Sequence, residues 1–300
     1  MKVQEDKQCC SVICLTKGSD SLYFVLWSLK HQIISTNFET IIVFEGDDKT
    51  RAKIVFFAES LNFLNLKLIQ NCGQGISNGR NIGSSAAESE ILIFIDDDAF
   101  LSKFFIQSHV NHHLINENSI GVGEKFQFIL TNKDKLARAR YLIGIFNHIE
   151  KYFDRVTTDW YEKSVADVLK FSKLKSISWY ACVGRNLSLS RTCFNRLQGF
   201  DTNFKKWGCE DIEFGFRAWT SGMTIDRVEN AANYHILHPI CKENLQQLND
   251  NLFYFERKYP YDLSVSLYRL FTFGRLGFEE IIDLTKKHAK EKVDYFLFMH

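Results

Sequence analysis

Three consecutive aspartates, Asp96, Asp97 and Asp98, directly follow the apolar run Ile91-Leu92-Ile93-Phe94-Ile95. Adjacent carboxylates repel one another, so a purely structural turn gains little from carrying three of them. Carboxylate oxygens suit Mg²⁺ and Mn²⁺, and an ion held there would offset the charge of a diphosphate. The alternative is a solvated acidic turn whose side chains cap the next helix. The triplet alone leaves both interpretations open.

A glycine-rich stretch, residues 75–83, precedes this run and contains one arginine, Arg80. Glycine lets the backbone approach a ligand closely, and a guanidinium pairs with a phosphate or with the edge of a nucleobase. We predict a loop here, followed by a helix from about Asn81 to Glu88. An ordinary turn with a helix cap is the alternative, because a single glycine-rich loop is weak evidence.

A second chemically informative run is Trp207-Gly208-Cys209-Glu210-Asp211. A hydroxyl that attacks a carbon atom needs a carboxylate within hydrogen-bond reach to accept its proton. Asp211 suits that role, Trp207 can stack on a flat ligand face, and Glu210 can bind ligand hydroxyls. The alternative is that both acids complement a helix dipole, which leaves Trp207 and Gly208 unexplained.

The elements that must position these residues alternate between strand and helix over residues 9–100. Apolar runs at residues 11–16, 40–44, 66–69 and 91–95 predict strands, with helical patterns between them at residues 22–29, 52–61 and 81–88. This order is typical of a parallel sheet with helices on both faces, where ligands bind beyond the carboxyl ends of the strands. Thr16, the acids Glu45, Asp47 and Asp48, and the aspartate triplet should therefore meet at one edge.

The rest of the chain is predicted to be mainly helical at first, over residues 103–116, 134–154 and 160–171. Strands at 187–189 and 224–228 and a helix at 211–221 follow, and the tail is helical with a charged amphipathic end near 279–292. We predict one domain over residues 1–240, with a nucleotide-binding half at about 9–100 and an acceptor half at about 101–240. Residues 241–300 form a helical C-terminal extension.

Residues 75–98 resemble the donor site of GT-A-fold glycosyltransferases, in which a G-x-s-x-a-R-N-x-G loop and a helix lead to an apolar strand ending in D-x-D. The resemblance implies an α/β, Rossmann-like fold with a mostly parallel central sheet. It also implies that Asp96 and Asp98 engage a nucleotide sugar and a Mn²⁺ or Mg²⁺ ion, with Asp98 as direct ligand and Asp97 in the turn. The acidic turn at Glu45-Gly46-Asp47-Asp48 resembles the turn with which the family binds the nucleobase, but its sequence differs from the usual one.

Three further runs resemble the acceptor half of chondroitin-polymerase-type and β-1,4-galactosyltransferase-type enzymes: residues 184–190, 199–201 and 207–217. Such enzymes carry G-W-G-G-E-D followed by an acid and an arginine, and here Cys209 replaces the second glycine. The resemblance places Gly184 and Trp207 at the donor site and covers about residues 9–240. In the family a histidine after the next strand completes the metal shell; His235 aligns best, and His238 is the substitute.

The resemblance implies a hexosyltransferase that moves a sugar from a nucleotide-diphosphate donor, with UDP favoured, to an acceptor hydroxyl or another nucleophile. A carboxylate at Asp211 is consistent with one in-line displacement and inversion. The acceptor stays open between a glycan, a lipid-linked glycan and a peptide, with a bacterial surface glycan as the default. One alternative is a sugar-1-phosphate nucleotidyltransferase, which should have a glycine-rich loop with a lysine directly after the first strand; Lys17-Gly18-Ser19 matches that loop only weakly. A second alternative is a module that binds a nucleotide sugar without catalysis.

The net charge of the 300-residue chain is +1, which argues against nucleic acid as partner because such binding needs a basic excess. The 8 cysteines form no C-x-x-C pair and predict reduced thiols rather than a zinc site. The polar start shows no secretory signal, and no run approaches the roughly 20 apolar residues of a membrane span. We therefore expect a cytoplasmic enzyme, with contact to the inner membrane surface left open.

Overall fold

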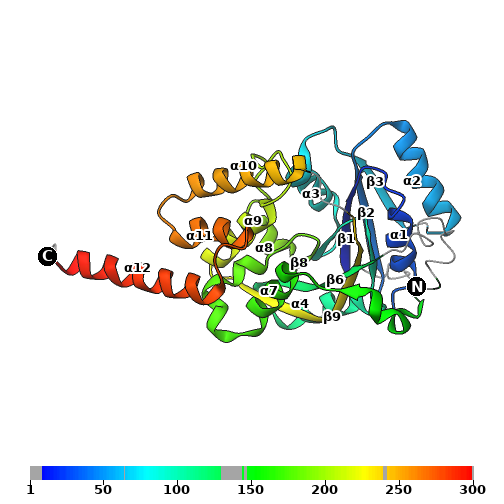
Figure 1. Cartoon of the computed structure of the whole chain (residues 1–300). Coiled ribbons are helices and arrows are strands. Elements are labelled where there is room, and N and C mark those ends of the chain that lie inside the picture. Colours follow the sequence, from blue (N-terminus) through cyan, green and yellow to red (C-terminus); the bar gives the residue numbers. More distant parts are fainter. Residues whose placement is uncertain (1–8, 64, 130–143, 145–146, 239–241, 299–300) are drawn as a thin grey trace, which may run out of the picture.

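The computed structural model describes residues 9–63, 65–129, 144, 147–238 and 242–298. Its described strands form a single nine-stranded sheet in the order β3-β2-β1-β4-β8-β6-β9-β5, with β7 paired to β6 (Figure 1). The strands are β1 (Cys10–Thr16), β2 (Phe38–Phe44), β3 (Leu66–Gln70), β4 (Ile91–Ile95), β5 (Ala99–Leu101), β6 (Ser119–Phe128), β7 (Val156–Thr157), β8 (Asn186–Ser190) and β9 (Thr224–Ile236).

Helices cover this sheet and continue beyond it. In chain order they are α1 (Leu22–Lys30), α2 (Asp48–Ser60), α3 (Gly75–Ala86), α4 (Phe105–Ile115), α7 (Trp160–Lys170), α8 (Arg191–Arg196), α9 (Glu210–Thr220), α10 (Lys242–Lys258), α11 (Leu263–Thr272) and α12 (Phe278–Phe298). Two 3₁₀ segments, η1 (Ile149–Arg155) and η2 (Ser172–Ala181), complete the described elements.

The predicted parallel arrangement of the first half is confirmed: β1 pairs in parallel with β2 and β4, and β2 with β3. Successive residues of a strand point to opposite faces, so each strand of this half feeds two cores. Ile13 enters the core shared with the later helices, whereas Val12 and Cys14 enter the core under α1, α2 and α4. Burial on both faces explains why β4 is apolar throughout.

The loop predicted before the helix at Asn81 is wrong, because α3 already begins at Gly75 and includes all of residues 75–83. Its glycines serve packing against the sheet rather than a flexible backbone. A Cβ added at Gly79 would lie 2.8 Å from Leu15 Cδ2, and one at Gly83 would lie 2.5 Å from Ile13 Cγ2. The helix therefore sits closer to β1 than larger residues would allow, which fixes the direction of the neighbouring Arg80.

The second half adds antiparallel strands to the sheet. β8 runs antiparallel to β4 and β6, β5 runs antiparallel to β9, and β6 and β9 pair in parallel. The prediction that the middle of the chain is mainly helical is wrong in part, because β6 lies within it. The glycines and polar residues of β6 hide its strand pattern. Most of the helix predicted at 134–154 lies outside the described residues, and Ile149–Arg155 at its end is a 3₁₀ segment.

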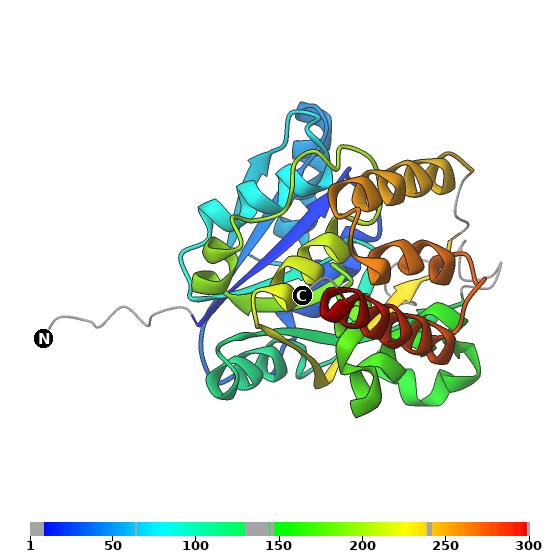
Figure 2. The ribbon, with the colours of Figure 1, turned by 90° about the vertical axis from the view of Figure 1, so that its left-hand side faces the viewer.

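The predicted helical tail is confirmed, and all three of its helices contribute to the main core, α12 through Ile281 and Ile282. Leu252 and Phe255 of α10 and Tyr268 of α11 are buried in the same cluster as Trp179. Figure 2 shows α10 and α11 beside each other, and Figure 1 shows α12 extending away from them. The boundary between a domain at 1–240 and a separate extension stays a prediction.

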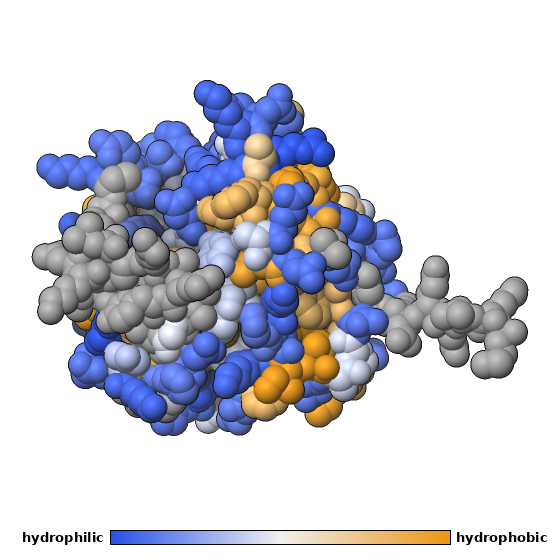
Figure 3. Space-filling model, turned by 90° about the vertical axis from the view of Figure 1, so that its right-hand side faces the viewer, coloured by the Kyte–Doolittle hydropathy of each residue, from blue (hydrophilic) through white to orange (hydrophobic). Residues whose placement is uncertain are grey.

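The face formed by α1 and α2 carries a band of apolar side chains among polar ones (Figure 3). Phe56 of α2 is 64% exposed. These helices leave part of their apolar surface uncovered, as most folded proteins do. Among the described residues, no helix has the length and apolar character needed to cross a bilayer.

Candidate active site at the strand ends

The carboxyl ends of β1, β2 and β4 meet at one edge of the sheet, as the parallel order predicts. Thr16 pairs with Phe44, and Cys14 pairs with Ile95, so Thr16 and the aspartate triplet extend together beyond β4. The Thr16 hydroxyl donates a hydrogen bond to Asp97 Oδ2. Asp97 is thereby held in the turn, while Asp96 and Asp98 remain available on either side.

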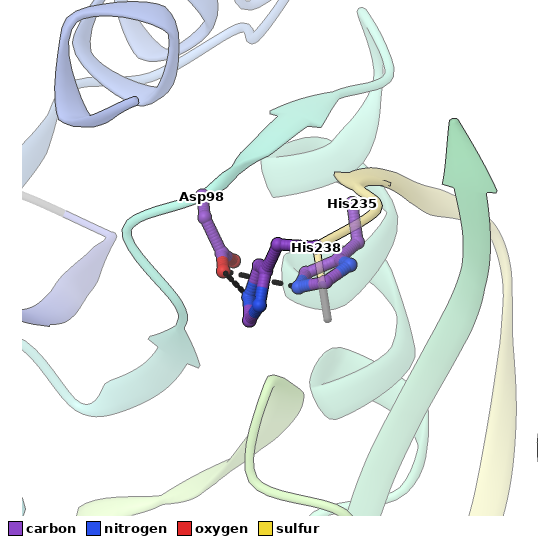
Figure 4. Close-up of side chains that lie close together, drawn as sticks. All are labelled: Asp98, His235 and His238. Carbon is purple, nitrogen blue, oxygen red and sulfur yellow. Dashed lines mark hydrogen bonds and ion pairs between the residues drawn. The ribbon is translucent and has the colours of Figure 1, made fainter. Parts of the chain in front are cut away.

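Asp98 and two imidazoles form one cluster (Figure 4). His235 Nε2 lies 3.0 Å and His238 Nε2 3.2 Å from Asp98 Oδ2, and one ligand atom of each residue lies within 4.8 Å of the others. The β5–β9 pairing sets this geometry, because Ala99 is opposite His235 and Ile236 N donates to Asp98 O. Both histidines therefore reach the same carboxylate, and Asp96 is not part of the described cluster.

This cluster fits a divalent cation. Asp98 Oδ1 is buried and has no hydrogen-bond partner in the described residues, so an anionic oxygen is left unused. One carboxylate and two imidazoles suit a first-row ion such as Mn²⁺ better than Mg²⁺, which prefers oxygen ligands. The fit rests on this unused oxygen and on the donor set of one oxygen and two nitrogens.

Burial and mutual repulsion shape the triplet's electrostatics. Burial, together with the charges of Asp98 and Asp96, raises the pKa of Asp97 to about 6. Burial and the charge of Asp98 also raise the pKa of Asp96. For Asp98, burial acts in the same direction, but the hydrogen bond and charge of His235 hold its pKa below the usual value. Asp98 is the member best held as a carboxylate, as a metal ligand must be.

The first turn of α9 supplies two buried acids. Asp211 Oδ2 accepts the Gly184 N–H at 2.7 Å, and its Oδ1 accepts the Ile212 N–H at 2.8 Å. Two backbone donors fix the orientation of this carboxylate and leave lone pairs for a further proton. The Gly184 backbone thus aligns Asp211. The sequence predicted a different role for Gly184, a contact with the donor nucleotide sugar.

Arg80 lies on α3 directly against this turn. Its Nη1 is 2.7 Å from Glu210 Oε1, both side chains are buried, and its guanidinium lies 5.2 Å from the centre of the Phe200 ring. Burial and the charge of Asp211 raise the pKa of Glu210 to about 7, against the lowering effect of Arg80. Arg80 therefore joins α3 to α9, and its contact with a donor nucleotide stays a prediction.

The turn before α9 is held by α10. Asn251 Nδ2 donates to Gly208 O at 2.6 Å and to Lys206 O at 3.1 Å, and Gln247 Oε1 accepts the Trp207 N–H at 3.0 Å. Trp207 itself is 37% exposed and available for stacking. Cys209 has a φ of 73°, which favours glycine, and its side chain is buried. The turn keeps a glycine-like backbone without a glycine.

The acidic turn after β2 divides its side chains between structure and surface. Asp47 caps α2, since its Oδ1 accepts the Thr50 N–H at 3.1 Å, and Asp48 opens the helix. Glu45 lies 3.2 Å from Lys17 at the end of β1. Glu45 directly follows β2, and its carboxylate does not cap a helix. The contact of one of these acids with a nucleobase stays a prediction.

Sequence reasoning missed three charged residues beside this site: Lys125 on β6, Glu162 on α7 and Arg185 before β8. Arg185 Nη2 and Glu162 Oε2 form a buried ion pair, and Lys125 Nζ lies 3.8 Å from Glu162 Oε1. Arg185 stands inside the motif Gly184-Arg185-Asn186, which was the available signal. Lys125 and Glu162 carry no local pattern, because tertiary packing alone brings them together.

Comparisons with known proteins agree with this geometry. Residues 11–171 match glycosyl transferase family 2, and residues 168–239 match the family described as the N-terminal domain of galactosyltransferase. The chain belongs to glycosyl transferase family 2. The predicted GT-A fold and glycosyltransferase activity are therefore confirmed.

Its relatives are diverse glycosyltransferases. The chain is 25% identical over 260 residues to chondroitin synthase of Escherichia coli, covering 79% of this chain and 37% of that protein. It is also 25% identical over 235 residues to hyaluronan synthase of Pasteurella multocida, covering 74% of this chain and 24% of that one. This glycosyltransferase thus spans about a quarter to over a third of these relatives' length.

Two further likenesses concern a smaller relative and a solved structure. Validoxylamine A glucosyltransferase of Streptomyces hygroscopicus subsp. limoneus is 24% identical over 259 residues, covering 83% of this chain and 56% of that protein. The crystal structure of S. aureus TarS superposes with a TM-score of 0.54 at 18% identity, covering 83% of this chain and 40% of that one. The TarS likeness supports the fold.

Proposed function

We propose that this glycosyltransferase moves a hexose from a UDP-sugar to an acceptor hydroxyl with inversion. The observation that carries the proposal is the pairing of two unlike sites. Asp98, His235 and His238 gather at the strand ends, while Asp211 stands oriented on α9. The positive charge of Arg80 acts on Asp96, two residues before Asp98, and is itself stabilised by Asp211, so one guanidinium is coupled electrostatically to the aspartate triplet and to the proposed base.

Asp98, His235 and His238 are the residues that would hold a Mn²⁺ ion, with Asp96 toward the nucleotide or the sugar. The bound ion would supply positive charge to the departing diphosphate. In the protein itself, the Ile236 N–H to Asp98 O bond and the β5–β9 pairing keep the carboxylate and His235 aligned. Thr16 keeps Asp97 out of that arrangement.

Asp211 is proposed to accept the proton of the acceptor hydroxyl as the new bond to the anomeric carbon forms. Gly184 and Ile212 hold the carboxylate by backbone N–H groups, so little reorganisation is needed during the reaction. Glu210 is proposed to bind ligand hydroxyls through Oε2, which is buried without a hydrogen-bond partner in the described residues. Trp207 offers an exposed ring for stacking on a sugar.

The donor nucleotide is proposed to lie along the edge from Glu45 to Asp96, with Thr16 at its centre. Asp47 and Asp48 act there mainly through the first turn of α2. The acceptor is proposed to be a glycan hydroxyl, which is supported by the polysaccharide synthases among the relatives. A lipid-linked glycan and a peptide are the alternatives, and the relatives include a polypeptide N-acetylgalactosaminyltransferase.

The deciding experiment incubates the protein with a panel of UDP-sugars, with and without Mn²⁺, and measures UDP release and the anomeric configuration of the product by NMR. Mn²⁺-dependent UDP release that Asp98→Ala and Asp211→Ala abolish, with an inverted product, supports the proposal. Full activity of both variants would contradict it. Pyrophosphate released from UTP and a sugar phosphate would favour the nucleotidyltransferase, and UDP-sugar binding without turnover would favour the binding module.

A further inference from the structure

Lys125 is a largely buried lysine on the same sheet face as the metal cluster. In the parallel β6–β9 pair, Gln127 lies opposite His235, and Lys125 lies opposite Asn233. Residues two apart on a strand share a face, so Lys125 and His235 project to the same side, one row apart. The charge of Lys125 also acts on both carboxyls: it opposes the rise that burial causes in the pKa of Asp96, and it adds to the lowering of the pKa of Asp98 by His235.

Glu162 connects Lys125 to Arg185. Glu162 Oε2 is bound by Arg185 Nη2, and the Lys125 ammonium faces the other oxygen, Oε1, at 3.8 Å. All three side chains are at most 13% exposed. Burial opposes the charge of Arg185, but Glu162, Asp96 and Asp211 raise its pKa. This second guanidinium thus interacts electrostatically both with Asp96 of the triplet and with Asp211, the proposed base.

The Glu162 contact does not satisfy the Lys125 ammonium group. At 3.8 Å the two atoms attract each other as ions, but they are too far apart for a hydrogen bond. An ammonium group has three donors, and among the described residues none accepts a hydrogen bond from Lys125 Nζ. Two cations share the single carboxylate of Glu162, and the other carboxylates that act on Lys125, Asp96 and Asp98, belong to the aspartate triplet. A ligand with anionic oxygens at this point would supply acceptors within hydrogen-bond reach of the ammonium group.

We propose that Lys125 donates hydrogen bonds to the diphosphate of the nucleotide sugar, and that Glu162 and Arg185 position it. This inference rests on the proposed function. When the bond between the anomeric carbon and the diphosphate oxygen breaks, its electron pair stays on that oxygen, and the acceptor's proton passes to Asp211. The diphosphate leaves with one more negative charge than it carried in the donor. The Lys125 contact strengthens as this charge develops, which makes it catalytic as well as binding.

The test replaces Lys125 by methionine, which has a similar length and no charge. UDP affinity, measured by calorimetry with Mn²⁺ present, should fall by about 10- to 100-fold, while uridine affinity should not change. Mn²⁺ affinity without nucleotide, measured by electron paramagnetic resonance, should rise by roughly two- to tenfold, because a repelling charge is gone. Lys163→Met removes an exposed lysine next to Glu162 and should change neither affinity.

Opposite shifts for UDP and Mn²⁺ are the signature of a charge that faces both. A structural role for Lys125 would weaken both ligands together, and this result, or unchanged UDP affinity, overturns the inference. If Lys125→Met lacks a cooperative thermal transition, Lys125→Arg decides: it should keep UDP affinity within about threefold, and a larger loss overturns the inference. Failure of the unsubstituted protein to bind UDP with Mn²⁺ would instead refute the proposed function.

Discussion

The buried pair of Arg80 and Glu210 gives the most quantitative prediction. Their side chains are 8% and 4% exposed, and Glu210 Oε2 has no hydrogen-bond partner in the described residues. Arg80→Met therefore leaves an uncompensated buried carboxylate, which typically costs about 3–5 kcal/mol of unfolding free energy. Replacing both residues by methionine removes the charge altogether, so the double variant should recover most of that loss.

The pH dependence of this loss has a definite sign. In the native protein the pKa of Glu210 is already raised to about 7, and Arg80→Met removes the charge that lowers it. The folded variant therefore binds a proton that the unfolded chain, with an ordinary glutamate, does not. Its stability relative to the unsubstituted protein rises as pH falls from 8 to 6, by up to about 1.4 kcal/mol per pH unit.

Urea denaturation followed by circular dichroism at pH 8 and pH 6 measures both effects. The control is Lys173→Met, which breaks the exposed pair of Lys173 and Glu279 and should cost less than about 1 kcal/mol. A cost for Arg80→Met no larger than that of this control at pH 8 would show that Glu210 is not left as an uncompensated buried charge. A double variant as unstable as the single one would show the same.

Two other predictions concern packing and protonation. Burial lowers the pKa of His109 to about 3 and that of His113 to about 4. Acidification from pH 7 to pH 5 should therefore lower the unfolding free energy by about 2 kcal/mol for each histidine. In thermal melts, His109→Phe should lose less stability between these pH values than the unsubstituted protein does. Gly215→Ala places a Cβ 2.2 Å from Cys182 Cβ and should destabilise by about 1–3 kcal/mol despite alanine's helix preference. Gly277→Ala, an uncrowded control, should change unfolding free energy little; equal effects would contradict the packing argument.

The sequence predicted the parallel half well because β1, β2 and β4 are buried on both faces. Ile91–Ile95 is continuously apolar, and an apolar run followed by acids marks both a strand and its end. β6 was missed because it is rich in glycine and half-exposed residues. Gly121 and Gly123 lie where neighbouring residues leave no space for a side chain. A Cβ at Gly123, for example, would lie 2.3 Å from Ala231 O. Such crowding depends on residues about a hundred positions away.

The candidate site was predicted to the extent that its chemistry follows strand ends and a motif. Asp98 could be named because it follows an apolar strand, and His235 and His238 because the family resemblance places a histidine after the later strand. The role of Arg80 could not be read from its loop, since its partner Glu210 lies 130 positions along the chain. Lys125 and Glu162 have no motif at all, and only the packing of α7 on the sheet reveals them.

The central claim is that Asp98 belongs to donor binding and Asp211 to proton transfer. Calorimetric titration of UDP with Mn²⁺ into two variants, combined with their transfer rates, tests it most directly. Asp98→Asn should lose UDP–Mn²⁺ affinity by more than the roughly 10- to 100-fold effect of an outer-shell partner. Asp211→Asn should keep that affinity within about threefold and lose transfer by about 10²- to 10⁴-fold. Normal UDP–Mn²⁺ binding by Asp98→Asn, or normal transfer by Asp211→Asn, would contradict the account.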